Sequence, residues 1–222
     1  MPTILIADDH PLFREALRHA VARIVPDARL HEADGVDALF ALVDAHPDAD
    51  LLLLDLNMPG VQGYGALVHL RGLHPQLPVV MVSGREEPTT IRRALEHGAA
   101  GFIPKSSDAA TIGEALSRVL EGERWMPPGL PAGEAIRDEE RDIARRLAEL
   151  TPQQFRVLQM LATGRLNKQI AGELDVSEAT VKAHMTAVLR KLGAGNRTQA
   201  VLLAGKLMLD PDAVVAPGDA DE

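Results

Sequence analysis

The chain has 222 residues, 46% of them hydrophobic and none cysteine, so it is long enough for two domains but can form neither disulfides nor thiolate metal sites. Its first apolar run ends at Asp8 and no stretch approaches the roughly 20 apolar residues of a membrane helix, so we expect no signal peptide, no membrane contact and a cytoplasmic protein. The net charge of −9 is uneven, since residues 151–209 carry eight Lys/Arg and three acidic residues, which predicts a polyanion partner for that part only.

Up to about residue 121, short apolar runs alternate with helix-length amphipathic stretches. This alternation is typical of βαβ units that build a parallel sheet. The predicted strands are 3–7, 29–33, 50–54, 78–82 and 100–103. The predicted helices are 11–24, 36–45, 64–73, 88–97 and 108–121. Together they predict one doubly wound α/β domain over residues 1–121.

Residues 122–149 are predicted to form a linker with a connecting helix. Six Gly and Pro residues fall within 122–133, a density that interrupts helices and strands. The apolar residues that follow have helical spacing and predict a helix within 134–150. Trp125, the only tryptophan, lies in the linker and is a candidate to pack against one of the domains.

Residues 150–209 are predicted to form an all-α domain. Thr151, Pro152 and Gln154 combine a capping box with a proline at the first helical position. The predicted helices are 152–162, 167–174, 177–192 and 197–208, with no strand pattern between them. Residues 210–222 are acidic and contain proline and glycine, which predicts a disordered tail.

Three carboxylates follow apolar strands of the predicted sheet. Asp8 and Asp9 come after the first strand, and Asp55 comes after the third. Carboxyl ends of parallel strands meet at one edge of the sheet, where open α/β folds place their active sites. Taken singly, each carboxylate would be a helix cap or a turn residue. Together they repel one another, which requires a cation and points to phosphoryl chemistry.

Two further polar residues follow strands at the same edge, Ser83 after the fourth and Lys105 after the fifth. Phosphoryl transfer needs an oxygen nucleophile, a divalent cation and fixed positive charge. Asp55 is the candidate nucleophile, and Ser83 and Lys105 are candidates to bind phosphoryl oxygens. The expected cofactor is Mg²⁺, and its candidate ligands are Asp9, Asp55, the backbone carbonyl of Asn57 and, through a bound water, Asp8.

Four separated motifs occur in one order along this domain: Asp8-Asp9, Asp55 with Met58-Pro59-Gly60, Ser83-Gly84, and the run from Gly98 to Lys105. They resemble the receiver domain of two-component response regulators. The resemblance implies a flavodoxin-like (βα)5 fold and transfer of a phosphoryl group from a sensor histidine kinase to Asp55. It also implies a switch in which Ser83 moves toward the phosphoryl group while Phe102 repacks. Ser106 occupies the position of a proline that is common in receivers, so the sequence leaves open whether the peptide bond after Lys105 is cis.

The helix predicted over 177–192 has an apolar face and a polar face. The apolar face carries Val181, Met185, Val188 and Leu192. The polar face carries Lys182, Ala183, Thr186 and Arg190. A helix in the DNA major groove needs short side chains that approach bases and cations that reach phosphates. Charge alone would also suit an ordinary solvated helix.

Motifs of a second kind cover residues 150–205, among them Leu150-Thr151-Pro152, the runs 167–171, 180–184 and 189–193, and 197–201. They resemble the LuxR-type helix-turn-helix domain of NarL/FixJ regulators. The resemblance implies a homodimer on double-stranded DNA, with 177–192 as recognition helix. The implied DNA contacts are Asn167, Lys168, Thr180, Lys182, Ala183, Thr186, Arg190, Lys191 and Arg197, and the implied dimer contacts are Val201 and Leu202.

The two resemblances together predict a transcription factor, not an enzyme, in which phosphorylation of Asp55 controls dimerisation and DNA binding. Two alternatives stay open. In the first, the receiver is a phosphorylation-independent dimerisation or protein-binding module. In the second, Asp55 is the nucleophile of a phosphohydrolase resembling the haloacid dehalogenase group. Against the second, Asn57 occupies the position of the second carboxylate that such enzymes need.

Overall fold

The computed structural model describes residues 1–131 and 135–207. The chain divides into two compact units, Met1–Arg137 and Asp138–Glu222. Within the described residues, no helix is both long and apolar enough to cross a membrane. The tail predicted over 210–222 lies outside the described residues.

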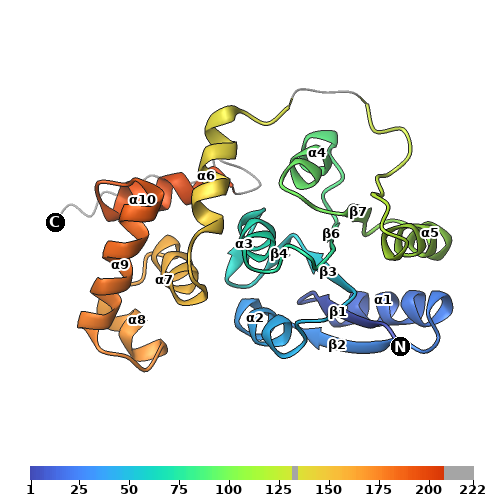
Figure 1. Ribbon diagram of the computed structural model, residues 1–222, viewed down its shortest axis with the longest axis horizontal. Helices are drawn as coiled ribbons and strands as arrows, with labels where there is room; N and C mark the ends of the chain where they lie inside the picture. Colours follow the sequence, from blue (N-terminus) through green and yellow to red (C-terminus); the bar gives the residue numbers. More distant parts are fainter. Residues whose placement is uncertain (132–134, 208–222) are drawn as a thin grey trace. The chain divides into compact units, whose positions relative to one another are not determined.

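A five-stranded parallel sheet forms the centre of the first unit, in the order β2-β1-β3-β6-β7. Its strands are β1 (Thr3–Ala7), β2 (Arg29–Ala33), β3 (Leu51–Asp55), β6 (Val79–Ser83) and β7 (Gly101–Pro104). The helices between them are α1 (Pro11–Ile24), α2 (Val36–Ala45), α3 (Gly65–Leu73), α4 (Pro88–Glu96) and α5 (Ala109–Leu120). Helices α1 and α5 cover one face of the sheet, and α2, α3 and α4 cover the other (Figure 1). The predicted doubly wound (βα)5 fold is confirmed.

The apolar runs of the sequence are buried on both faces of this sheet. Ile4, Ile6 and Leu53 pack in one core with residues of α1 and α5. Alternate residues of a strand point to opposite faces, and Leu5 and Leu54 are likewise fully buried. Since helices cover both faces, no position of these strands requires a polar residue, which explains the uninterrupted apolar runs.

Several strands end one residue later than predicted. Asp55 is the last residue of β3 and pairs with Val82, and Ser83 is the last residue of β6. The apolar pattern stops before these residues although the backbone pairing continues through them. A short antiparallel pair, β4 (Asn57–Met58) and β5 (Val61–Gln62), was not predicted because two-residue strands show no periodicity.

The start of the linker is part of the first unit. Trp125 is buried in the same core as α1 and α5, as predicted for one of the domains. The backbone N–H of Trp125 donates to the carbonyl of Ala100 at 3.0 Å. Trp125 also forms a parallel bridge with Gly101, the first residue of the edge strand β7. Farther along, the N–H of Ile136 donates to Glu96 at 3.0 Å.

The second unit consists of five helices in its described part: α6 (Asp138–Ala148), α7 (Pro152–Ala162), α8 (Asn167–Glu173), α9 (Glu178–Leu192) and α10 (Arg197–Gly205). Its core includes Val157, Ile170 and Val181 from α7, α8 and α9. The predicted capping box is present, because Gln154 N–H donates to Thr151 Oγ1 and Thr151 N–H donates to Gln154 Oε1. The all-α prediction for this part is confirmed.

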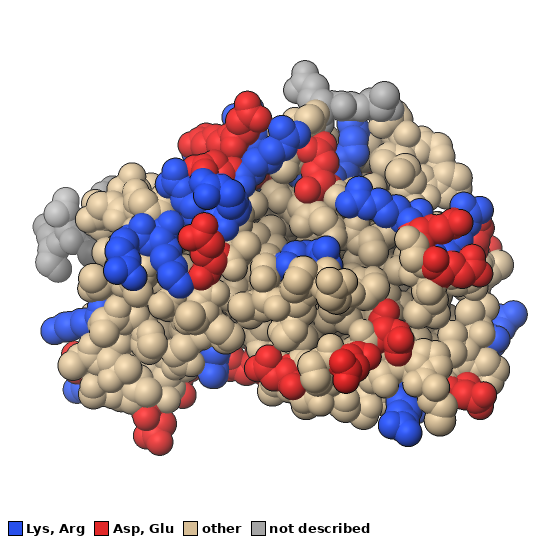
Figure 2. All heavy atoms as spheres, in the orientation of Figure 1, with Lys and Arg blue, Asp and Glu red and all other residues tan. Residues whose placement is uncertain are grey.

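The predicted connecting helix exists as α6 and packs against α9 and α10. Asp142 pairs with Arg145 at 2.6 Å and with Arg146 at 2.5 Å. Figure 2 shows acidic and basic side chains lying together over this helix. Arg146 also donates to the carbonyl of Leu192 at 2.9 Å, so α6 is joined to the end of α9. The domain limits predicted from sequence stay predictions.

Candidate functional site

The carboxyl edge of the sheet brings two buried carboxylates together. Asp8 follows β1 and is 1% exposed, and Asp55 ends the neighbouring strand β3 and is 5% exposed. Asp9, beside Asp8, is partly buried. Burial of two carboxylates is costly unless they are paired with cations, so the positive groups around them determine what the site can do.

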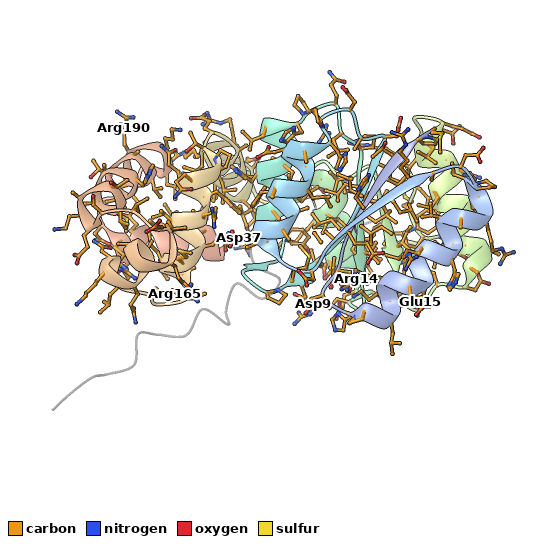
Figure 3. The ribbon with its side chains drawn as sticks, turned by 90° about the horizontal axis from the view of Figure 1, so that it is seen from below. Asp9, Arg14, Glu15, Asp37, Arg165 and Arg190 are labelled. Carbon is orange, nitrogen blue, oxygen red and sulfur yellow. The ribbon has the colours of Figure 1, made fainter. Side chains whose placement is uncertain are left out.

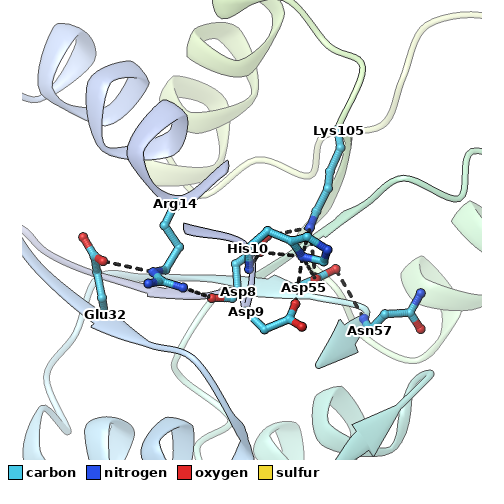
Figure 4. A network of polar contacts seen from close by, with 8 residues as sticks. All are labelled: Asp8, Asp9, His10, Arg14, Glu32, Asp55, Asn57 and Lys105. Carbon is cyan, nitrogen blue, oxygen red and sulfur yellow. Dashed lines mark hydrogen bonds and ion pairs between the residues drawn. The ribbon is translucent and has the colours of Figure 1, made fainter. Parts of the chain in front are cut away.

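Lys105 supplies a cation to both buried carboxylates. Its Nζ lies 2.7 Å from Asp8 Oδ2 and 3.0 Å from Asp55 Oδ2 (Figure 4). The same ammonium lies 4.8 Å from the centre of the Phe13 ring, a cation–π contact from α1. One ammonium for two carboxylates leaves negative charge in excess at this edge.

Burial raises the pKa of Asp55, while the hydrogen bond and charge of Lys105 act in the opposite direction and the charge of Asp8 adds to the increase. A raised pKa means that the ionised form is unfavourable in this environment. A bound cation would stabilise that ionised form. The backbone N–H of Asn57 donates to Asp55 Oδ1 at 3.3 Å and orients the carboxylate.

His10 is a member of the site that sequence reasoning missed. Its Nδ1 lies 2.8 Å from Asp9 Oδ1 and 3.2 Å from Asp8 Oδ1. It also lies 3.8 Å from Asp55 Oδ2, and its side chain is 63% exposed. The available signal was its position directly after Asp8-Asp9, which forces it onto the same edge.

The carboxylates fit a divalent cation. Asp8, Asp9, His10 and Asp55 each offer a ligand atom, all within 4.8 Å of one another. Asp8 Oδ2 and Asp9 Oδ1 are buried oxygens whose close polar neighbours are Lys105 Nζ and His10 Nδ1, respectively. Mg²⁺ prefers oxygen ligands and retains several waters, so the three aspartates, rather than His10, match it. An acidic pocket of this composition is typical of a Mg²⁺ site.

A pocket of about 530 Å³ opens over Asp55. The residues that line it are His10, Leu12, Phe13, Asp55, Asn57, Gly84, Arg85 and Lys105. No atom lies within 4 Å of the position that a Cβ on Gly84 would occupy, so the approach on that side is open. The pocket makes the carboxylate of Asp55 accessible to a ligand.

The two predicted switch residues, Ser83 and Phe102, lie on β6 and β7, which are neighbours in the sheet. Ser83 is 1% exposed, and its Oγ accepts a hydrogen bond from the N–H of Arg85 at 3.0 Å. Phe102 is fully buried on β7, paired in register with Met81. Within the described residues every peptide bond is trans, including the one after Lys105.

The predicted recognition helix is α9, and its two faces are as expected. Val181, Val188 and Leu192 are buried, and Met185 is half-buried. The polar face is exposed and consists of Lys182, Ala183, Thr186 and Arg190. Arg190 projects away from the helices (Figure 3). The hydroxyl of Thr186 donates to the carbonyl of Lys182 at 3.0 Å and retains its acceptor capacity.

The remaining predicted contacts differ in accessibility. Lys168 is exposed, and Asn167 is half-buried at the start of α8. The hydroxyl of Thr180 is hydrogen-bonded to the hydroxyl of Ser177, the N-cap residue of α9. Lys191 donates to the carbonyl of Glu149 and to Gln154, and Arg197 donates to the carbonyl of Arg165. In α10, Val201 is half-buried and Leu202 is 51% exposed.

Both units match known families. The model of the response regulator receiver domain matches residues 4–117, and that of bacterial regulatory proteins of the luxR family matches residues 148–204. The chain is 42% identical over 213 residues to the glycerol metabolism activator of Pseudomonas putida, covering 93% of this chain and 96% of that protein. It is 32% identical over 204 residues to the nitrate/nitrite response regulator protein NarL of Escherichia coli K12, covering 90% and 93% respectively.

Solved structures give the same result. A LuxR family DNA-binding response regulator from Silicibacter pomeroyi is 33% identical with a TM-score of 0.51, covering 59% of this chain and all of that one. RcsB from Salmonella enterica serovar Typhimurium, bound to a promoter with BeF₃⁻, shares the fold at 22% identity and a TM-score of 0.55, covering 93% and 99%. This chain belongs to the two-component response regulators of the NarL family, which join a receiver domain to a LuxR-type helix-turn-helix and regulate transcription.

Proposed function

We propose that Asp55 accepts a phosphoryl group from the phosphohistidine of a sensor kinase, and that this controls dimerisation and DNA binding. The observation that supports it is the placement of Asp55 and Lys105 in one pocket, with Lys105 Nζ within 3.0 Å of the carboxylates of both Asp55 and Asp8. Formation of a covalent acyl phosphate needs an accessible carboxylate nucleophile, together with fixed positive charge that can pair with the phosphoryl oxygens.

In this mechanism an oxygen of Asp55 attacks phosphorus while the bond to the histidine nitrogen breaks and the electron pair leaves with the imidazole. Lys105 then pairs with the phosphoryl oxygens instead of with the ionised carboxylate alone. Asp9, Asp55 and the carbonyl of Asn57 would hold Mg²⁺ directly, and Asp8 would hold it through a bound water. The ion would supply positive charge to neutralise the charge that develops on the transferring group. Hydrogen bonding from Ser83 to the new group would free space in which Phe102 repacks.

The output is transcriptional control by a homodimer on double-stranded DNA in the cytoplasm. The exposed face of α9, with Lys182, Thr186 and Arg190, is the proposed reading surface. A solved relative has been described as two RcsB dimers bound to two parallel DNAs. The exposed Leu202 on α10, beside Val201, is the proposed dimer contact.

DNA-binding affinity and molecular mass, each measured with Mg²⁺ before and after addition of beryllofluoride, test this proposal. Beryllofluoride occupies the position of the phosphoryl group. A change of mass or affinity in the wild type but not in Asp55→Asn supports the proposal, and Asp48→Asn, an exposed carboxylate, is the control that should respond like the wild type. DNA binding that beryllofluoride leaves unchanged in all three proteins would favour a phosphorylation-independent receiver.

A further inference from the structure

Arg14 on α1 contacts the main chain at the carboxyl edge of the sheet. Its Nη1 donates to the backbone carbonyl of Asp8 at 2.6 Å (Figure 4). The side chain is only 17% exposed. Within the described residues, the guanidinium of Arg14 forms no ion pair with Asp8, Asp9 or Asp55. The role of Arg14 therefore differs from that of Lys105.

The bond to Asp8 fixes more than one atom. The carbonyl of Asp8 and the N–H of Asp9 belong to one planar peptide group. The N–H of Asp8 already donates to the carbonyl of Ala33 at 3.1 Å. With the carbonyl held by Arg14 as well, the chain is fixed on both sides of Asp8, and the plane from which Asp9 extends is set.

Arg14 is itself oriented by Glu32 on the edge strand β2. Its Nε donates to Glu32 Oε2 at 3.1 Å. Glu32 also neutralises the guanidinium, which matters because an uncompensated cation beside the pocket would repel Mg²⁺. Arg18, one turn farther along α1, lies 3.4 Å from Glu32 Oε1, is 57% exposed and has no contact with Asp8 among those found.

We infer that Arg14, oriented and neutralised by Glu32, is a positioning residue for the Mg²⁺ site, which it acts on through the peptide group between Asp8 and Asp9. The inference rests on the proposed function and adds a determinant of cation affinity to it. Partners that orient metal ligands from outside the coordination sphere change affinity by roughly ten-fold to a hundred-fold.

Charge and positioning predict opposite effects when Arg14 is removed. If the guanidinium acted only as a nearby positive charge, its loss would strengthen Mg²⁺ binding. If it positions Asp8 and Asp9, its loss weakens binding despite the gain in negative potential. The sign of the change therefore separates the two roles.

The experiment is calorimetric titration of Mg²⁺ into chelator-treated full-length protein. We expect Arg14→Met to bind about ten-fold more weakly than the wild type. Arg18→Met removes an equal charge from the same partner and should bind as well as the wild type or more tightly. Urea unfolding followed by Trp125 fluorescence verifies that each variant is folded.

Equal or tighter Mg²⁺ binding by Arg14→Met would overturn the inference, as would equal weakening by Arg18→Met. If Arg14→Met does not fold, Arg14→Lys decides, since it keeps the charge and loses the forked donor. Weaker binding by that variant supports positioning, and wild-type affinity refutes it. A wild type that binds no Mg²⁺ would refute the Mg²⁺-dependent function itself, a result distinct from failure of the Arg14 role alone.

Discussion

Lys105→Met removes the only cation within 3.0 Å of the two buried carboxylates among the described contacts. Removal of one partner from a buried ion pair costs about 3–5 kcal/mol. The lower end, about 3 kcal/mol, is expected because Lys105 is 18% exposed and because the raised pKa of Asp55 allows it to take up a proton. The variant should therefore be much less stable in a chelator than the wild type.

Magnesium should reverse much of this loss. A ligand at about 100 times its Kd stabilises the native state by about 2.7 kcal/mol. In Lys105→Met the cation meets two carboxylates with no competing ammonium, so Mg²⁺ should stabilise the variant more than the wild type. The stability of the first unit can be followed alone, because Trp125, the only tryptophan, is buried in its core.

The assay is urea unfolding by tryptophan fluorescence, in chelator and in Mg²⁺. Arg23→Met, a loss of equal charge at the exposed end of α1, is the matched control and should change stability by less than about 0.5 kcal/mol. If Lys105→Met matches this control in chelator, or gains no more from Mg²⁺ than the wild type, then Lys105 is not the resident counter-ion of both carboxylates.

Three further outcomes are expected. Gly101→Ala should lower the free energy of unfolding by about 1–2 kcal/mol, since its Cβ would lie 3.1 Å from the carbonyl oxygen of Trp125. Gly84→Ala is the control, because its Cβ would meet no atom within 4 Å, and equal urea midpoints for the two variants would contradict this packing. Arg190→Ala should weaken DNA binding and make the log–log salt slope shallower by about one, so an unchanged slope would exclude a phosphate contact. Because the folded pKa of Asp55 is raised, its stabilising contribution is complete below the unfolded pKa and is lost as pH rises through the folded pKa. Mg²⁺ affinity should fall as pH drops through the same range. Mg²⁺ titration in a pH series would refute this if the affinities of wild type and Asp55→Asn showed the same dependence on pH.

Much of the pocket could be predicted from the sequence because its residues are tied to strand ends. Asp8, Asp55 and Lys105 follow or end apolar runs, and parallel pairing places such ends at one edge. The position of Asp55 within β3 rather than after it could not be predicted, since backbone pairing continues beyond the apolar pattern.

Contacts that depend on the register between strands or on side-chain conformations could not be predicted. Arg14 and Glu32 are 18 residues apart, and neither differs in sequence from an ordinary surface charge. Their contact arises because β2 pairs with β1 and places Glu32 beside α1. The internal bonds of Lys191 and Arg197 have the same character, since a basic residue in a motif does not reveal whether it faces solvent or a backbone carbonyl.

The central claim is that Asp55 is the phosphoacceptor. It is tested most directly by incubation of the protein with Mg²⁺ and a small phosphodonor such as phosphoramidate, followed by borohydride reduction of the acyl phosphate and peptide mass spectrometry. We predict one reduced site, at Asp55, that is absent without Mg²⁺ and absent in Asp55→Asn. Modification at Asp8 or Asp9 instead, or none at all under conditions in which the protein binds Mg²⁺, would contradict the account.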